Sequence, residues 1–403
     1  MRLPDDDAIV PFFQPIIAVD TRKIVGYEVL GRVRTPSGVY SLGPFFHDPA
    51  VPKGAKVKAD RLIRQKALAL VAAAGIGAKV FLNIQPQWAY PFLRHDRRLP
   101  TVDYLQTYGI PGHQIVIEIS EAGASVAPKD LAELAGRYRE AGCQVALDDF
   151  GLEFNNLERI FVLKPDFLKI STALSGDTSN KTLFCSLLRV LGLFAQETGL
   201  DLVLEGVETE AQFLAGLGAG VRYFQGHFLA SPQPELLPED SPADLIAREL
   251  DHYVSGKVKR WTGELEIAAQ MNALLNEVSG VADRLDECLC RLLRAALPSW
   301  VRVYVCDGYG YQLTPNYVSN GTGNWLPQYE YVGRNWCWRP YFLPYVVEAA
   351  RKRQGVLSAA YLDLESCRPI RTFVYPLGAD RFLFIDLDAD SEGFAKIEER
   401  DPG

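Results

Sequence analysis

The chain has 403 residues, of which 48% are hydrophobic and 23% charged, and this composition excludes a disordered or fibrous protein. Its net charge of -8 argues against DNA binding, because a surface that coats nucleic acid needs a basic face. No apolar run is long enough for a membrane span, and the seven cysteines contain no Cys-x-x-Cys pair. Residues 1–20 lack a basic segment followed by an apolar core, so we expect no secretory signal. We therefore expect a cytoplasmic protein with reduced thiols.

The first 240 residues alternate between strand-like and helical segments. Two strand-like runs, 12–19 and 23–33, flank the turn signal Asp20-Thr21-Arg22. Further strands are expected at 79–84, 115–121, 145–149, 167–170, 202–208 and 223–226. Helices are expected at 57–74, 129–141, near Leu157, 183–198 and 209–217. This alternation predicts parallel βαβ units, and its length favours an α/β fold with a (β/α)8 TIM-like barrel over a doubly wound open sheet.

Polar residues occur at or near the carboxyl ends of these strands, where barrel enzymes build their sites. They are Glu28, Asn83, Glu118, Asp148, Asp149, Lys169, Glu205 and Gln225. A lone Asp-Asp pair more often caps a turn, but acids in four separate strands are explained best if they converge. Carboxylates in contact disfavour joint ionisation unless a cation is present. Oxygen ligands suit Mg²⁺ or Mn²⁺, and a pair of metal ions suits the hydrolysis of a phosphate ester.

Seven motifs follow one another between residues 8 and 233. They are Glu28-Val-Leu-Gly-Arg32, Asn83-Ile-Gln-Pro86, Glu118-Ile-Ser-Glu121, Asp148-Asp-Phe-Gly151, Lys169-Ile-Ser171, Glu205-Gly-Val-Glu208-Thr209 and Gln225-Gly226. In order and spacing they resemble the motifs of EAL domains, the bacterial cyclic-di-GMP phosphodiesterases. The resemblance implies a barrel that hydrolyses cyclic di-GMP to linear pGpG.

The resemblance also implies a role for each motif residue. Two Mg²⁺ or Mn²⁺ ions would be held or bridged by Glu28, Asn83, Glu118, Asp148, Asp149 and Glu205. Glu205 and Lys169 would be catalytic, Glu205 by taking a proton from the attacking water and Lys169 by steadying water and phosphate. Gln225 would orient a metal-bound water. The substrate would be contacted by Gln14, Arg32, Lys169 and Glu208, although Arg32 is also explained as an exposed arginine paired with an acid.

The sequence departs from the family pattern at three places. Val29 replaces an alanine, which leaves the neighbouring ligand unchanged, and Ser171 stands where the family usually has aspartate. The loop after Gly151 reads Leu-Glu-Phe-Asn-Asn-Leu where the family usually has Thr-Gly-Tyr-Ser-Ser-Leu. In the family this loop couples a homodimer to the site, with Glu121 resembling its anchor. Because Glu153 replaces a flexible glycine, the alternative function is a catalytically weak receptor that binds cyclic di-GMP.

A Pro-rich boundary follows the last motif and divides the chain further. We expect an EAL barrel at 1–240, a helical connector at 241–297 and a small α+β domain at 298–403. Strands are expected in this domain at 300–306, 310–318, 355–362, 370–376 and 381–387, with one helix at 341–353. Segment 334–342 and the run Tyr361-Leu-Asp363 resemble the PAS-like or Cache-like C-terminal domain of YkuI-type EAL proteins, which implies that this domain regulates the barrel.

The aromatic side chains of this small domain have two interpretations. They form its core, or they bind a small sensory ligand. The residues of that possible ligand site are Trp336, Trp338, Arg339, Tyr341 and Asp363.

Overall fold

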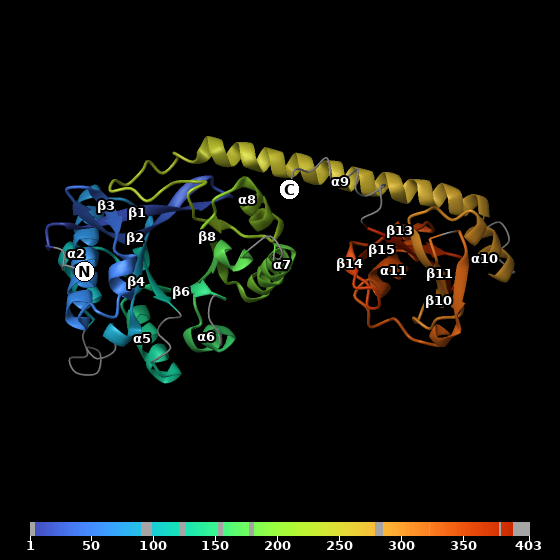
Figure 1. Ribbon diagram of the computed structural model, residues 1–403, viewed down its shortest axis with the longest axis horizontal. Coiled ribbons are helices and arrows are strands. Elements are labelled where there is room, and N and C mark those ends of the chain that lie inside the picture. The colour runs from blue at the N-terminus through green and yellow to red at the C-terminus, as the bar shows by residue number, and fades with distance from the viewer. Residues whose placement is uncertain are drawn as a thin grey trace. The chain divides into compact units, whose positions relative to one another are not determined.

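The computed structural model describes residues 5–89, 99–120, 126–151, 156–176, 181–278, 285–321, 323–378 and 380–389 (Figure 1). Its described residues up to Tyr253 form one compact unit, and those from Val254 onward form a second. Within these ranges no helix has the length and apolar character needed to cross a bilayer. All seven cysteines lie in the described ranges and none forms a disulfide.

The strands of the first unit close into a barrel. In circular order they are β1 (Ile9–Ala18), β2 (Lys23–Thr35), β4 (Lys79–Ile84), β5 (Ile115–Ser120), β6 (Gln144–Phe150), β7 (Phe167–Ser171), β8 (Asp201–Glu205) and β9 (Tyr223–Phe224), which returns to β1. Strand β1 runs antiparallel to both neighbours, whereas the pairs from β2–β4 to β8–β9 are parallel. The barrel prediction is therefore confirmed, and the open-sheet alternative is wrong.

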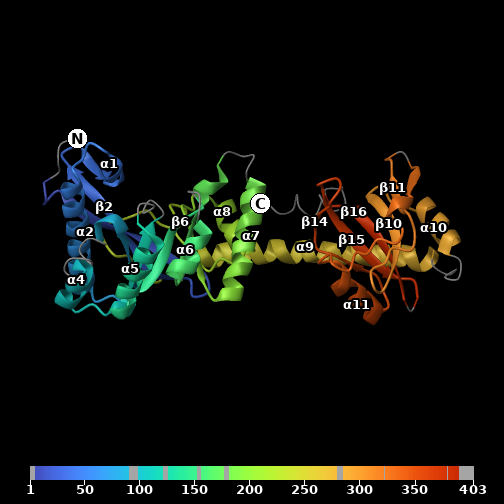
Figure 2. The same ribbon diagram turned by 90° about the horizontal axis from the view of Figure 1, so that it is seen from below.

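Helices lie around these strands in both views (Figures 1 and 2). They are α1 (Gly43–His47), α2 (Lys53–Ala74), α4 (Pro100–Tyr108), α5 (Pro128–Glu140), α6 (Asn156–Leu163), α7 (Lys181–Thr198) and α8 (Glu210–Gly218). The ends of these helices have local causes. Gly75 ends α2 in the left-handed conformation, at φ 61°, and Thr209 with Gln212 forms a capping box at the start of α8. The sequence reading missed α1, α4 and the short strand β3 (Gly38–Ser41), which extends β2.

Strand residues with opposite orientations build two apolar regions. Outward-facing residues such as Leu82, Leu147 and Leu204 join the main core. Inward-facing residues form a separate layer across the barrel interior: Ile16, Phe81, Val116, Ala146, Phe167 and Val203. Gly26 completes this layer because a Cβ there would lie 2.7 Å from the Phe81 ring. The barrel interior is therefore filled by side chains at this level.

The second unit contains an antiparallel sheet. Its strands are β10 (Trp300–Asp307), β11 (Asn316–Ser319), β12 (Trp325–Gln328), β13 (Val356–Leu357), β14 (Tyr361–Leu362), β15 (Pro369–Pro376) and β16 (Arg381–Asp388). They pair in the order β12-β11-β10-β16-β15-β13, and β14 also pairs with β15. The helices are α9 (Ala243–Val278), which begins in the first unit, α10 (Leu285–Arg294) and α11 (Phe342–Lys352). The predicted α+β character is confirmed, while the boundaries at 240 and 297 stay predictions.

Alternation along the strands covers both faces of this sheet. Val303 and Val305 pack on the core that includes Met271 of α9, whereas Tyr304 and Cys306 belong to the core with α11. Two expected strands proved too long. Segment 310–318 becomes a strand only from Asn316, and segment 355–362 divides into β13 and β14 at Ser358, whose Oγ accepts a hydrogen bond from the Thr372 amide at 2.8 Å.

Candidate active site

A polar layer lies next to the apolar layer of the barrel, two residues further along each strand towards its carboxyl end. Asn83, Glu118 and Asp148 each follow an apolar-layer residue by two positions, and so do Lys169 and Glu205. Because side chains alternate along a strand, the period of two brings both sets to the same inner face. Parallel strands all end at one edge, so the polar residues gather at the carboxyl ends of the strands. The predicted convergence of these residues is found in the structure.

Lys169 is the centre of this layer. Its side chain is fully buried, and its Nζ lies within ion-pair distance of four carboxylates. The separations are 2.7 Å to Glu118 Oε1, 3.0 Å to Asp148 Oδ1, 3.1 Å to Glu28 Oε2 and 3.2 Å to Glu205 Oε2. Burial lowers the pKa of Lys169, but these carboxylates outweigh burial and hold the pKa well above its ordinary value. Lys169 is therefore a charged, positioned ammonium group.

Two amide side chains, in addition to Lys169, contact the Glu28 carboxylate and orient it. Asn83 Nδ2 donates to Glu28 Oε1 at 2.8 Å, and Gln225 Nε2 donates to Glu28 Oε2 at 2.6 Å. Gln225 Nε2 also donates to Gln14 Oε1 at 3.1 Å, so Gln14 contacts the polar layer through Gln225. Burial raises the pKa of Glu28, yet Lys169 and the two amides more than compensate and lower it. Glu28 is consequently ionised and held in one orientation.

The Asp148–Asp149 pair needs a backbone irregularity to act together. Neighbouring strand residues point to opposite faces, so an ideal β6 would direct Asp149 away from Asp148. In the structure the pairing of β6 with β7 shifts between Leu147 and Phe150, and Asp149 has a left-handed φ of 56°. Carboxylate oxygens of Asp148, Asp149 and Glu205 thereby lie within 4.8 Å of one another. A positive φ is rare for a residue other than glycine and occurs often at functional sites.

The electrostatics of the polar layer call for a cation. Burial, and then the charges of Glu28 and Asp148, raise the pKa of Glu118 well above its ordinary value despite Lys169. Burial also raises the pKa of Glu205, to about 8. Among the described residues, Glu118 Oε2 has no hydrogen-bond partner, and Glu118 Oε1 and Asp148 Oδ1 contact the Lys169 ammonium group. Four carboxylates around one ammonium group, with a fifth, Asp149, beside Asp148 and Glu205, fit divalent cations with oxygen ligands.

A cavity of about 340 Å³ opens beside the polar layer. Glu28, Asn83, Asp148, Asp149 and Glu205 line it, and so does the partly buried Arg32. Among the other predicted residues, Glu118, Lys169 and Gln225 belong to the polar layer without lining the cavity. Glu208 is exposed and is not among the described residues that line the cavity. Glu121 and the loop residues 152–155 lie outside the described residues, as does the side chain of Asn156.

Sequence reasoning missed an ion pair in the cavity wall. Asp60 and Arg64 of α2 are in direct contact, and Arg64 Nη1 donates to the Asn83 carbonyl at 3.5 Å. The only signal is an acid and a base four positions apart on a helix, which is also the pattern of an exposed pair. Here Arg64 is 8% exposed, and burial raises the pKa of Asp60.

Comparisons with known proteins agree with this geometry. Residues 2–232 match the EAL domain, and residues 236–391 match the EAL-domain associated signalling protein domain. The chain therefore belongs to the EAL-domain family, and it carries that associated signalling domain.

Several relatives can be named. The chain is 32% identical over 393 residues to YkuI of Bacillus subtilis, an uncharacterised EAL-domain containing protein, and the alignment covers 96% of this chain and 95% of YkuI. The crystal structure of YkuI with cyclic di-GMP and calcium matches this fold with a TM-score of 0.85 over 95% of this chain and 97% of YkuI. The cyclic di-GMP phosphodiesterase RocR of Pseudomonas aeruginosa is 26% identical over 57% of this chain and 59% of RocR.

Proposed function

We propose that the barrel binds cyclic di-GMP and hydrolyses it to linear pGpG with two Mg²⁺ or Mn²⁺ ions. The observation that carries this proposal is the convergence of five carboxylates and Lys169 at one end of the barrel, next to a cavity lined by Arg32. The likeness to YkuI, solved with cyclic di-GMP and calcium, and to the phosphodiesterase RocR supports it.

The chemistry follows from the positions of these side chains. The water oxygen bonds to one of the two phosphorus atoms, one P–O ester bond of that linkage breaks and opens the ring, and the departing ribose oxygen takes up a proton. Divalent cations held by Glu28, Asn83, Glu118, Asp148, Asp149 and Glu205 would supply a nucleophile near neutral pH and neutralise phosphate charge. Glu205, at the edge of the cluster, accepts the proton of the attacking water, and Gln225 would orient a metal-bound water. Lys169 holds the carboxylates in place and stabilises the negative charge that develops on the phosphate.

Turnover by the purified protein tests this proposal. Cyclic di-GMP is incubated with the full chain and Mg²⁺ or Mn²⁺, and the products are separated by chromatography. We expect pGpG to accumulate with either metal and to disappear when EDTA is present. Binding of cyclic di-GMP without pGpG in either metal would instead identify the alternative function, a receptor with little catalytic activity.

Arg32 provides a test of the substrate site. We expect Arg32→Ala to weaken binding of cyclic di-GMP by about tenfold or more, because a charge-assisted contact to phosphate contributes on the order of 1.5–3 kcal/mol. Isothermal calorimetry with Ca²⁺ in place of the catalytic metal measures this affinity without turnover. Arg34→Ala, an exposed arginine on the same strand, is the matched control. Unchanged affinity in Arg32→Ala would remove this residue from the site.

The sequence of the loop after Gly151 is the feature that distinguishes the two possible functions, an efficient enzyme and a receptor with little turnover. We expect the combined changes Leu152→Thr, Glu153→Gly, Phe154→Tyr, Asn155→Ser and Asn156→Ser to raise kcat about tenfold while leaving affinity for cyclic di-GMP nearly unchanged. Such a split means that the restored contact acts mainly in the transition state. Side-by-side kinetics of parent and variant measure it.

The opposite outcome for the loop is equally specific. A parent that already turns over at about 1 per second or faster, with a loop variant no faster, would show that the loop is competent as it stands.

We also propose a homodimer that forms through α7. Leu183, Leu187, Val190 and Leu193 follow helical spacing, and each is between 40% and 71% exposed. Phe161 on the preceding helix α6 is exposed as well. An exposed apolar stripe of this kind favours burial against a partner, and a second copy is the partner that the family resemblance implies. Sedimentation velocity of the full chain tests this, and a monomer throughout the micromolar range would contradict it.

The C-terminal domain is proposed to regulate turnover. Its match to the EAL-domain associated signalling domain supports this role. The measurement is the hydrolysis rate of the full chain with and without acetate, succinate or glycine, three small carboxylates. A rate that never changes when such a ligand is bound would exclude regulation by that route.

A further inference from the structure

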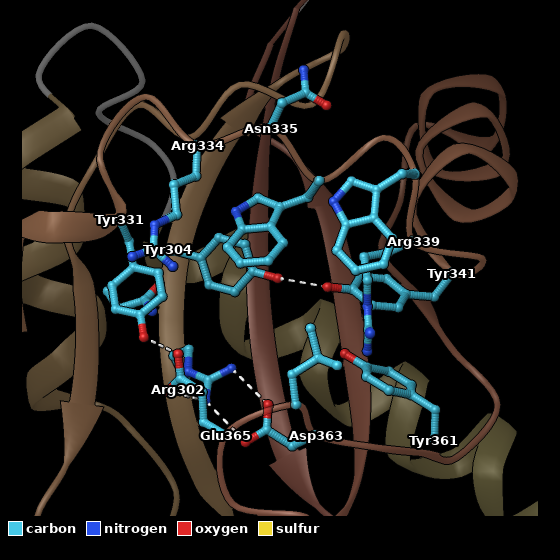
Figure 3. A pocket seen from close by; sticks show the side chains of 14 residues that line it. Arg302, Tyr304, Tyr331, Arg334, Asn335, Arg339, Tyr341, Tyr361, Asp363 and Glu365 are labelled. Carbon is cyan, nitrogen blue, oxygen red and sulfur yellow. Dashed lines mark hydrogen bonds and ion pairs between the residues drawn. The ribbon is translucent and has the colours of Figure 1, made fainter.

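The C-terminal domain contains a cavity of about 460 Å³ with an unusual wall (Figure 3). The cavity is large enough for a small metabolite. Its lining combines aromatic rings with charged groups, and it includes all five residues of the predicted ligand site: Trp336, Trp338, Arg339, Tyr341 and Asp363. None of these residues belongs to the barrel, so the cavity is independent of the candidate active site.

One arginine of the cavity is already occupied by acids. Arg302 donates to both carboxylate oxygens of Asp363, at 3.1 and 3.2 Å, to Asp386 at 3.1 Å and to Glu365 at 3.4 Å. Ser366 adds two hydrogen bonds to Asp363 through its amide and hydroxyl groups. These contacts explain why the pKa of Asp363 is lowered although burial raises it. Arg302 therefore has a structural role and is not the group that waits for a ligand.

Arg339 has a different environment. Its guanidinium lies over three aromatic rings, at 5.3 Å from the Trp338 centroid, 5.4 Å from Tyr361 and 5.5 Å from Tyr341. Figure 3 shows it beside Tyr341 and Tyr361. Among the described residues Arg339 forms no ion pair with a carboxylate. Aromatic faces hold the cation in place, but they leave its planar set of N–H donors without an acceptor.

Two of the three rings around Arg339, and the neighbouring ring of Trp336, are held in place by further contacts. Tyr341 and Tyr361 stack with centroids 4.5 Å apart, and the Tyr361 hydroxyl lies 2.5 Å from Thr372 Oγ1. Trp336 Nε1 donates to the buried Gln312 at 2.8 Å. Both Tyr residues and Trp336 thus serve as a rigid wall, which lowers the entropic cost of binding. The cavity is a preorganised site for a ligand with a small apolar body.

We propose that this cavity binds a small organic carboxylate, which Arg339 holds through paired hydrogen bonds. A carboxylate matches the two-donor geometry of a guanidinium. An aromatic cage could by itself hold a cationic ligand, but the Arg339 guanidinium already fills that position. The aromatic rings of Trp336 and Trp338 contact the carbon atoms of the ligand, and Glu365, which already accepts hydrogen bonds from Arg302 and Tyr331, is the carboxylate that can also accept one from an amino group where the ligand has one.

Calorimetry on the full chain tests the proposal. The probes are acetate, succinate and glycine, with choline and inorganic phosphate as probes that lack a carboxylate. We expect at least one of the three carboxylates to bind and the two other probes to give no heat. Tighter binding of glycine than of acetate would assign an amino acid as the ligand class, and the reverse order would assign a simple carboxylic acid.

Variants locate the binding. Arg339→Gln should weaken binding of the carboxylate at least about tenfold. Arg339→Lys keeps the charge but loses the planar donor pair, so its affinity for the carboxylate should lie between those of Arg339→Gln and the parent. Arg351→Gln, at an exposed site on α11, is the control and should bind as the parent does. Quenching of tryptophan fluorescence gives a second readout, since Trp336 and Trp338 line the cavity. Three results would each overturn the proposal. The parent binds none of the three carboxylates, the parent binds choline or phosphate more tightly than any carboxylate, or both Arg339 variants are folded and bind the carboxylate as tightly as the parent does.

Discussion

Asp148→Asn is expected to abolish hydrolysis of cyclic di-GMP and to weaken divalent metal binding by more than about 100-fold. Loss of residues that merely support a ligand already reduces affinity about 10–100-fold, and a carboxylate oxygen of Asp148 lies within 4.8 Å of carboxylate oxygens of Asp149 and Glu205. The amide keeps the shape of the side chain but removes its charge. Glu28→Ala should act in the same direction through another ligand position. Calorimetric titration with Mn²⁺ and the pGpG assay measure the two effects separately.

The control for these variants is Glu133→Ala, an exposed acid on the outer helix α5. It should keep parental metal affinity and turnover. Full turnover in either Asp148→Asn or Glu28→Ala would sink the assignment of two metal ions to this cluster. Circular dichroism and thermal unfolding confirm that each variant is folded before its activity is interpreted.

Lys169→Met is expected to destabilise the metal-free protein by about 3–5 kcal/mol, because removing one partner of a buried ion pair leaves uncompensated charge. The Nζ of Lys169 is the shared partner of Glu28, Glu118, Asp148 and Glu205, and its side chain is only 1% exposed. Divalent cations should recover more stability in this variant than in the parent, since they replace the missing positive charge and bind only the folded state. Urea unfolding with and without Mg²⁺ measures both quantities.

Hydrolysis should be lost in Lys169→Met even where Mg²⁺ restores its stability. Lys129→Met, on the exposed side of α5, is the matched control for the loss of a lysine. Parental stability of Lys169→Met without metal would show that the carboxylates do not need this ammonium group, and the electrostatic account of the polar layer would then be wrong.

The sequence predicted the architecture well wherever signals were local. The turn signal Asp20-Thr21-Arg22 correctly predicted the β1–β2 hairpin. The bounds of the predicted strands that carry the motifs agree with those of the observed strands to within a few residues. Alternation of side chains also suffices to derive the polar layer, because Glu118 follows Val116 by two positions and Lys169 follows Phe167 likewise. These features depend on neighbours in the chain, which is why they are readable without coordinates.

Sequence alone determined the fold class, the family resemblance and the candidate ligand set. Only the tertiary structure decided how those groups act together. It shows that one Lys169 ammonium serves four carboxylates, that a bulge with φ 56° brings Asp149 beside Asp148, and that the paired Asp60 and Arg64 line the cavity. It also shows that Arg302 is occupied by acids while Arg339 is held by rings. The physical reason is that burial and ion pairing depend on distances between residues far apart in the chain, and the side-chain pattern along a strand does not contain those distances.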